Sequence, residues 1–177
     1  MPTATARVTM KGNPVNLTGR HPQIGQPAPD CILMANDLSE VQLSSFKGKK
    51  IIVSVVPSLD TPVCDLQTKR FNKEAASLQD TVILTISMDL PFAQKRWCGI
   101  TASDKIKTLS DYRHASFAQE YGVLIENLRL LTRAIFIIDS NGILRYKQIV
   151  PEITQEPNYE EVLQSVKKIS PDYPKFI

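Results

Sequence analysis

Hydrophobic and polar positions alternate at the start of the chain and predict two β-hairpins. Residues 6–19, ARVTMKGNPVNLTG, alternate on both sides of the turn sequence KGNP. Residues 31–46, CILMANDLSEVQLSSF, predict a second hairpin that turns at Asn36 and Asp37. A segment rich in proline and glycine, residues 21–30, connects the two hairpins.

Two unbroken apolar runs further along the chain predict strands that are buried on both faces. Residues 51–56 (IIVSVV) and 81–87 (TVILTIS) are rich in β-branched residues, which is typical of a parallel sheet covered by helices. Between them, four apolar positions share one face of a predicted helix: Cys64, Phe71, Ala75 and Leu78. This part of the chain therefore predicts a β-α-β unit.

The second half of the chain predicts two helices, a hairpin and a last helix. We expect a short helix between Asp89 and Gly99, and another one within residues 110–123. Residues 134–150 predict two strands, because an Asn-Gly dipeptide interrupts them where a hairpin would turn. Residues 156–168 predict the final helix, whose acidic start and basic end suit the helix dipole.

This order of elements predicts an α/β fold. A β-α-β unit joined to a hairpin and a final helix is a thioredoxin-like arrangement, here with an added N-terminal β-hairpin. We expect a single thioredoxin-like domain over residues 1–177, with a short C-terminal tail from about residue 169. No repeat, low-complexity segment or long linker divides the sequence.

Composition and charge narrow the classes of function. The chain is 42% hydrophobic and 22% charged, with a net charge of +3 and no run of five or six basic residues. Neither nucleic acid nor an anionic membrane is therefore an expected partner. The polar N-terminus does not resemble a signal peptide, and no apolar stretch is long enough to span a membrane. We expect a cytoplasmic protein.

The cysteines have no spacing typical of a metal site. Cys31, Cys64 and Cys98 are separated by 33 and 34 residues, without a close Cys-x-x-Cys pair, and the chain has two histidines, His21 and His114. Structural zinc sites usually contain such a pair, so we expect no metal. In the reducing cytosol, these thiols either pack in the core or carry out redox or catalytic chemistry.

Cys64 lies where a reactive thiol can be made. Thr61 and Pro62 are typical of a helix start, with threonine as N-cap and proline at the first helical position. Cys64 then falls in the first turn, where unpaired N–H groups and the positive end of the dipole favour the nucleophilic thiolate. Asp65 opposes this with an adjacent negative charge. Arg133, just before a predicted strand, is a candidate cation beside the thiol.

The same residues also fit a protein in which the thiol only packs. Cys64 shares its helical stripe with Phe71, so it can be a small core residue. Thr61 can act as a cap alone, and Arg133 can be a surface cation with a packed stem. The residues around Cys64 leave both interpretations open.

Cys98 adds a second thiol at the end of a short helix, next to Gly99. If a peroxide oxidised Cys64 to a sulfenic acid, a second thiol could condense with it to form a disulfide. A disulfide requires Cα atoms within about 7 Å. A thioredoxin-like layout places the two helices near one another. Helices on opposite faces of the sheet could bring the thiols together only after local unfolding, which would be easiest at the Gly99 end, and whether such unfolding is needed stays open.

Two motifs resemble those of one family. Residues 57–64, PSLDTPVC, resemble the Pro-x-x-x-Thr-x-x-Cys active-site signature of peroxiredoxins. Residues 87–98, SMDLPFAQKRWC, resemble the segment that marks the thiol peroxidase branch and carries its resolving cysteine. The separation of 34 residues between the two cysteines also matches. Residues 8–19 resemble the N-terminal hairpin of that branch, and the likeness extends to about Lys168.

The resemblance implies an antioxidant thiol-dependent peroxidase with an atypical 2-Cys mechanism. Cys64 would be the peroxidatic cysteine and Cys98 the resolving one, with a redox-active disulfide inside one chain. Pro57 would shield Cys64 from solvent, and Thr61 would hydrogen-bond the thiolate and the peroxide oxygen. Arg133 would stabilise the thiolate and the charge that develops on the leaving oxygen.

The resemblance also implies substrates and partners. These are hydrogen peroxide and alkyl or lipid hydroperoxides as substrates, thioredoxin as reductant, and a homodimer. No metal, haem or flavin cofactor is implied. Cys31 belongs to neither motif and is expected to be a buried spectator, and His114 is expected at the surface.

Two alternatives remain. A non-enzymatic redox sensor of the same fold would use the same cysteines, and only sustained turnover with a reductant would separate it from an enzyme. An interaction module with a thioredoxin fold would only pack its cysteines, so Cys64 would alkylate slowly in the native protein.

Overall fold

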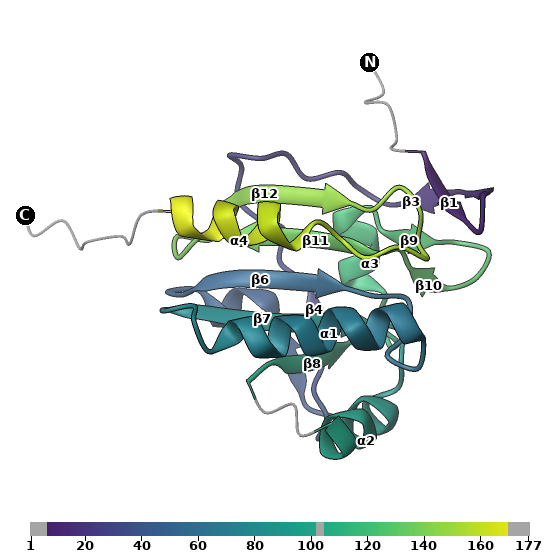
Figure 1. Ribbon diagram of the computed structural model, residues 1–177, viewed down its shortest axis with the longest axis horizontal. Helices are drawn as coiled ribbons and strands as arrows, with labels where there is room; N and C mark the ends of the chain where they lie inside the picture. Colours follow the sequence, from purple (N-terminus) through teal and green to yellow (C-terminus); the bar gives the residue numbers. More distant parts are fainter. Residues whose placement is uncertain (1–6, 102–104, 170–177) are drawn as a thin grey trace, which may run out of the picture.

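A seven-stranded mixed sheet forms the centre of the structure, a computed structural model described here for residues 7–101 and 105–169 (Figure 1). From one edge to the other, its strands are β12 (Leu144–Ile149), β11 (Ala134–Ile138), β6 (Lys50–Val55), β7 (Thr81–Ser87), β8 (Lys107–Ser110), β4 (Ile32–Met34) and β5 (Glu40–Gln42). Strands β6, β7 and β8 are parallel, while the outer pairs are antiparallel. The predicted α/β architecture is confirmed.

Within the described residues, four α-helices pack around this sheet: α1 (Pro62–Ala75), α2 (Pro91–Thr101), α3 (Ser116–Tyr121) and α4 (Tyr159–Lys168). Figure 1 shows α1 and α4 in front of the sheet, α3 behind it and α2 below β8. Residues of β6 alternate between two core clusters, with Ile52 in the cluster that contains α1 and α4, and Val53 in the cluster that contains α3. Both faces of β6 are buried, which explains its unbroken apolar run.

Helices α1 and α2 lie near one another, as the thioredoxin-like layout predicts, and they share one side of the core. Trp97 of α2 packs into the same core cluster as Cys64 and Phe71 of α1. In addition, the Trp97 indole Nε1–H donates to Asp65 Oδ1 at 2.9 Å. The two cysteine-bearing helices are therefore neighbours in one layer.

Both predicted N-terminal hairpins are present. Strands β1 (Val8–Met10) and β2 (Asn13–Val15) pair antiparallel as a separate two-stranded sheet, and β4 pairs with β5. The short 3₁₀ helix η1 (Leu43–Phe46) follows β5. A further sheet, which the sequence did not reveal, has the order β10 (Leu130–Leu131), β9 (Leu124–Ile125) and β3 (Leu17–Thr18). Strands of two residues are too short to produce a recognisable alternation.

Two predicted helix ends differ from the observed ones. Helix α2 continues through Gly99 to Thr101, and α1 ends at Ala75, before Leu78. Glycine is only mildly unfavourable inside a helix, so Gly99 did not terminate it. The expected tail from about residue 169 lies outside the described residues, apart from Ile169 itself.

The helix expected within residues 110–123 is shorter than that segment. The buried carboxylate of Asp111 accepts hydrogen bonds from the backbone N–H groups of Phe117 (3.1 Å) and Ala118 (2.8 Å). This fixes the start of α3 at Ser116, because the first N–H groups of a helix have no partner within it. Gly122 closes the helix in the left-handed conformation, with a φ of 66°.

Candidate active site

The loop between β6 and α1 places Cys64 in the first turn of the helix. The Cys64 side chain is fully buried in the core cluster beneath α1. Thr61 occupies the N-cap position and Pro62 the first helical position, as expected. The Thr61 hydroxyl, however, makes no capping bond and donates instead to the Ser58 carbonyl oxygen at 3.1 Å. The helix N–H groups near Cys64 therefore have no side-chain oxygen of Thr61 bonded to them.

Arg133 meets the Cys64 sulfur from the segment just before β11. Its side chain is only 2% exposed, and its Nη2 lies 3.3 Å from Cys64 Sγ. Nη1 donates to Gln67 Oε1 at 2.8 Å, and Nε donates to the Ile153 carbonyl oxygen at 2.8 Å. These three contacts define both the place and the plane of the guanidinium.

The surroundings of Arg133 indicate which group balances its charge. Arg133 takes part in none of the ion pairs found among the described residues. Besides Cys64, its guanidinium donates to the Gln67 side chain and to the Ile153 backbone carbonyl, and both of these acceptors are neutral. A buried cation without a counter-ion is strongly unfavourable. Among these contacts, Cys64 is the group able to carry a negative charge, so it is the candidate counter-ion of Arg133.

Gln67 is a site residue that the sequence analysis missed. It is fully buried one helical turn after Cys64 and joins Arg133 to β6, because its Nε2 donates to Ser54 Oγ at 2.7 Å. A polar residue three positions from Cys64, on the side of the helix that also carries Phe71, was the signal that could have identified it.

Replacing Gln67 with methionine is expected to destabilise the protein and to leave the Arg133 guanidinium less firmly held. The change keeps the volume but removes the acceptor for Arg133 Nη1, which leaves a buried charged donor unpaired. We expect the free energy of unfolding to fall by about 1–3 kcal/mol. Native alkylation of Cys64 by iodoacetamide is expected to slow as well. The exposed Gln164, on α4, is the matched control for the same substitution, and equal effects at both positions would contradict this role.

The loop that carries Pro57 and Thr61 is held by Asp89. Ser58 Oγ donates to Asp89 Oδ1 at 2.7 Å, and the Leu59 N–H donates to Asp89 Oδ2 at 2.8 Å. Pro57 is buried, whereas Thr61 is exposed. Since Asp89 lies two residues before the first residue of α2, its carboxylate connects the loop before Cys64 to the start of the helix that carries Cys98.

Asp65 is less unfavourable to a thiolate than the sequence suggested. Its Oδ2 forms an ion pair with Lys69 Nζ at 2.8 Å, and its Oδ1 accepts from Trp97. The negative charge next to Cys64 is therefore partly offset by a cation one turn further along α1.

Cys98 lies in α2 and is not bonded to Cys64. All three cysteines are free thiols, and the Cys98 sulfur lies 3.4 Å from Thr108 Oγ1 on β8. Cys98 is half-buried and borders a cavity of about 540 Å³ that is also lined by residues of β8 and of the β4–β5 hairpin. The structure therefore brings Cys64 and Arg133 together, whereas the Cys98 sulfur contacts Thr108 instead.

The remaining sequence candidates lie away from this centre. Cys31 is 4% exposed, and burial, followed by the negative charge of Asp111, raises the pKa of its thiol. A thiol of this kind is unreactive, in agreement with a spectator. His114 is exposed and lies 3.5 Å from Glu40. Within the described residues, no group of three or more His, Cys, Asp or Glu side chains could hold a metal ion.

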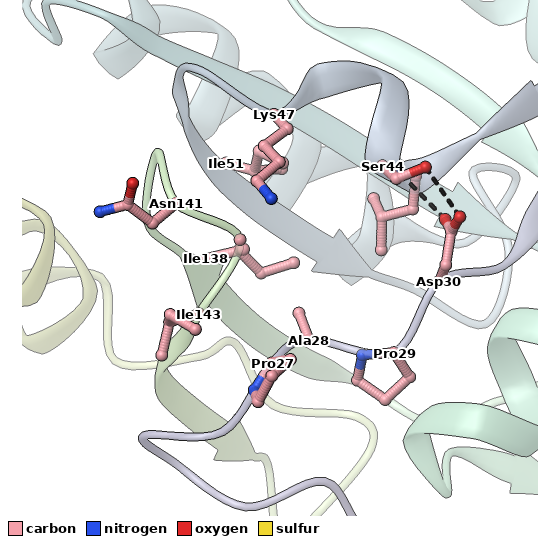
Figure 2. A pocket seen from close by; sticks show the side chains of 12 residues that line it. Pro27, Ala28, Pro29, Asp30, Ser44, Lys47, Ile51, Ile138, Asn141 and Ile143 are labelled. Atoms are coloured by element: carbon pink, nitrogen blue, oxygen red, sulfur yellow. Dashed lines mark hydrogen bonds between the residues drawn. The ribbon is translucent and has the colours of Figure 1, made fainter.

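A separate pocket of about 250 Å³ opens at the other end of the sheet (Figure 2). It lies beside Ile51 at the start of β6 and Ile138 at the end of β11, whereas Cys64 follows the end of β6 and Arg133 precedes β11. The lining is mostly apolar, and Figure 2 shows Lys47 extending toward its centre. None of the sequence-predicted site residues borders it.

Comparisons with known proteins identify the family. The Redoxin family model matches residues 23–163, a span that contains Cys64, Cys98 and Arg133. The chain belongs to the Redoxin family. The thiol peroxidase of Oceanobacillus iheyensis is 52% identical over 163 residues, which cover 92% of this chain and 99% of that protein. The thiol peroxidase of Bacillus subtilis is 50% identical, covering 93% of this chain and 98% of that protein.

A solved structure agrees with this assignment. A peroxiredoxin-like protein from Aquifex aeolicus superposes with a TM-score of 0.87 at 42% identity, covering 93% of this chain and 97% of that one. The predicted thioredoxin-like fold with an added N-terminal hairpin is therefore confirmed. This Redoxin protein is an enzyme of the peroxiredoxin type with thiol-dependent peroxidase activity. Among its described residues, no helix has the length and apolar character to cross a membrane.

Proposed function

We propose that this Redoxin enzyme reduces hydroperoxides with Cys64 as the peroxidatic thiolate and Arg133 as its counter-ion. The observation that carries the proposal is the contact of 3.3 Å between Arg133 Nη2 and Cys64 Sγ, made by a buried cation with no carboxylate in contact among the described residues. A cation in this place stabilises the thiolate and also the negative charge that develops on the leaving oxygen.

The first step oxidises Cys64. The thiolate attacks one peroxide oxygen, the O–O bond breaks, and its electron pair leaves with the second oxygen, which takes a proton to become water or an alcohol. Cys64 then carries a sulfenic acid. In this step, Thr61 would turn its hydroxyl from the Ser58 carbonyl toward the peroxide oxygen, and buried Pro57 would keep bulk water from the sulfur.

Cys98 resolves the sulfenic acid. Its thiol attacks the Cys64 sulfur, a sulfur–sulfur bond forms within the chain, and the hydroxyl group leaves as water. The position of α2 directly beside α1 supports this step, because the two helices already share a hydrogen bond from Trp97 to Asp65. Since Cys64 is fully buried and Cys98 contacts Thr108, local unwinding around Cys98 must precede bond formation.

A dithiol reductant completes the cycle by supplying two electrons and two protons. We take thioredoxin as the reductant, hydrogen peroxide and alkyl or lipid hydroperoxides as the substrates, and a cytoplasmic homodimer as the working form. The thiol chemistry balances without a metal, haem or flavin, so the proposal includes no cofactor. One domain carries out all the steps.

Mass spectrometry tests the proposal directly. Reduced protein receives one equivalent of hydroperoxide and is then analysed intact and as peptides. A loss of two hydrogen atoms, mapped to a bridge between Cys64 and Cys98 in one chain, is the expected result. A stable single-oxygen adduct on Cys64 would instead favour a sensor or one-cysteine mechanism. An unmodified Cys64 would overturn the peroxidase role of this residue.

A further inference from the structure

Glu152, in the loop after β12, binds the N-terminal hairpin. Its carboxylate accepts hydrogen bonds from Thr9 Oγ1 (2.6 Å) and from the backbone N–H groups of Lys11 (2.8 Å) and Gly12 (3.1 Å), which form the hairpin turn. Within its own loop it also accepts from the Thr154 hydroxyl at 2.8 Å. These bonds, that from Thr9 first, lower the pKa of Glu152 to about 2. The carboxylate is therefore an anion at any physiological pH.

Backbone hydrogen bonds join the same loop to the hairpin on both sides of Glu152. The Thr9 N–H donates to the Pro151 carbonyl at 2.8 Å, and the Ile153 N–H donates to the Thr9 carbonyl at 2.9 Å. The Ile153 side chain is buried in a small core cluster with Val8 of β1 and Ile125 of β9. Ile153 is thus fixed between the hairpin and the body of the protein.

Ile153 is one of the three residues that orient the guanidinium of Arg133. The Ile153 carbonyl oxygen accepts from Arg133 Nε at 2.8 Å, while Gln67 and the Cys64 sulfur contact the two terminal nitrogens. A guanidinium is planar, so a shift of the carbonyl at Nε tilts Nη2 away from the sulfur. Small displacements of a charged group at a reacting centre have large effects on rate.

We propose that Glu152 is a positioning residue for the peroxidatic step. By holding the hairpin turn against its own loop, Glu152 fixes the Ile153 carbonyl and thereby directs Arg133 at Cys64. The N-terminal hairpin then supports the active site indirectly, because it holds the loop of Ile153 without itself providing a contact to the Cys64 sulfur. This inference rests on the proposed role of Arg133 and Cys64, and adds to that role a remote residue that sets its geometry.

The test compares Glu152→Gln with Glu156→Gln. Glutamine keeps the shape of Glu152, but its amide nitrogen cannot accept the bonds to Thr9 and Gly12. Glu156 lies four residues further along the chain, accepts only from the Tyr159 hydroxyl among the bonds described, and serves as the control. Two quantities are measured at a temperature well below unfolding: the rate of Cys64 oxidation by hydrogen peroxide in a single turnover, and the pH profile of Cys64 alkylation by iodoacetamide.

Glu152→Gln is expected to slow oxidation by roughly 5-fold and to move the alkylation profile to higher pH, because a misdirected Arg133 stabilises the thiolate less. Glu156→Gln is expected to match the wild type in both measurements. Thr9→Val removes only the contacts of one hydroxyl, to Glu152 at 2.6 Å and to the Pro151 carbonyl at 3.4 Å, and is expected to give a smaller change in the same direction. If Glu152→Gln proves too unstable to purify, Thr9→Val supplies the test, and an unchanged profile would overturn the inference.

The outcomes separate this inference from the proposed function. A wild-type Cys64 that reacts neither with peroxide nor rapidly with iodoacetamide would overturn the role of Cys64 itself. A reactive wild type with unchanged Glu152→Gln kinetics would overturn the role of Glu152 and leave the proposed function intact. A purely structural hairpin would lower the melting temperature of Glu152→Gln while its pH profile stayed that of the wild type, which also contradicts positioning.

Discussion

Replacing Arg133 with methionine is expected to slow the oxidation of Cys64 by hydroperoxide about 100-fold or more, the loss typical when one charge-stabilising donor is removed. Methionine fills much of the same space, but it leaves the thiolate and the leaving oxygen without a cation. The rate is measured by stopped-flow fluorescence of Trp97, which is the single tryptophan of the chain and donates to Asp65, the neighbour of Cys64. A rate within a few-fold of the wild type would contradict the assignment of Arg133.

Lysine at the same position distinguishes charge from geometry. Arg133→Lys keeps a positive charge, but one ammonium group cannot reach the Cys64 sulfur, Gln67 and the Ile153 carbonyl in the way the guanidinium does. We expect an intermediate rate. Arg133→Met and Arg133→Lys both leave buried acceptors unpaired, and each unpaired group is expected to lower the free energy of unfolding by about 1–3 kcal/mol. Their melting curves therefore accompany the kinetics, so that unfolded protein is not counted as slow enzyme.

The second large effect is expected from Cys98→Ser. The first oxidation of Cys64 should keep its rate, because Cys98 contacts Thr108 and not the site around Arg133. Turnover with thioredoxin, in contrast, should be lost, since the sulfenic acid has no second thiol in the chain with which to condense. The measurement is peroxide consumption over many turnovers, combined with the mass of the protein after one equivalent of peroxide.

Cys31→Ala is the matched control for that experiment. Cys31 is buried in the other core cluster, and burial raises the pKa of its thiol, so its removal should leave turnover unchanged. If Cys98→Ser retained full turnover, resolution by Cys98 would be wrong. If Cys31→Ala lost turnover, Cys31 would instead be the thiol that resolves Cys64.

The regular elements were predictable wherever a local pattern determined them. The apolar runs of β6 and β7 predicted buried parallel strands, and the Asn-Gly turn predicted the pairing of β11 with β12. Strand β8, Lys107–Ser110, was missed because its sequence KTLS has neither an apolar run nor a clear alternation. It is buried on account of its neighbours, β7 and α2, which a local window does not contain.

Some features of the candidate site were likewise predictable from local sequence, and others were decided only by the fold. The sequence by itself determined that Cys64 lies in the first turn of a helix after a buried strand, because proline, threonine and the apolar run are close together in the chain. It also supplied Arg133 as a candidate cation. Only the tertiary structure decided that α1 and α2 share one layer, and that Gln67 and the Ile153 carbonyl hold the guanidinium. These contacts join positions 20 and 66 residues apart in the chain, and no local propensity encodes such distances. Packing of the folded chain alone brings them together.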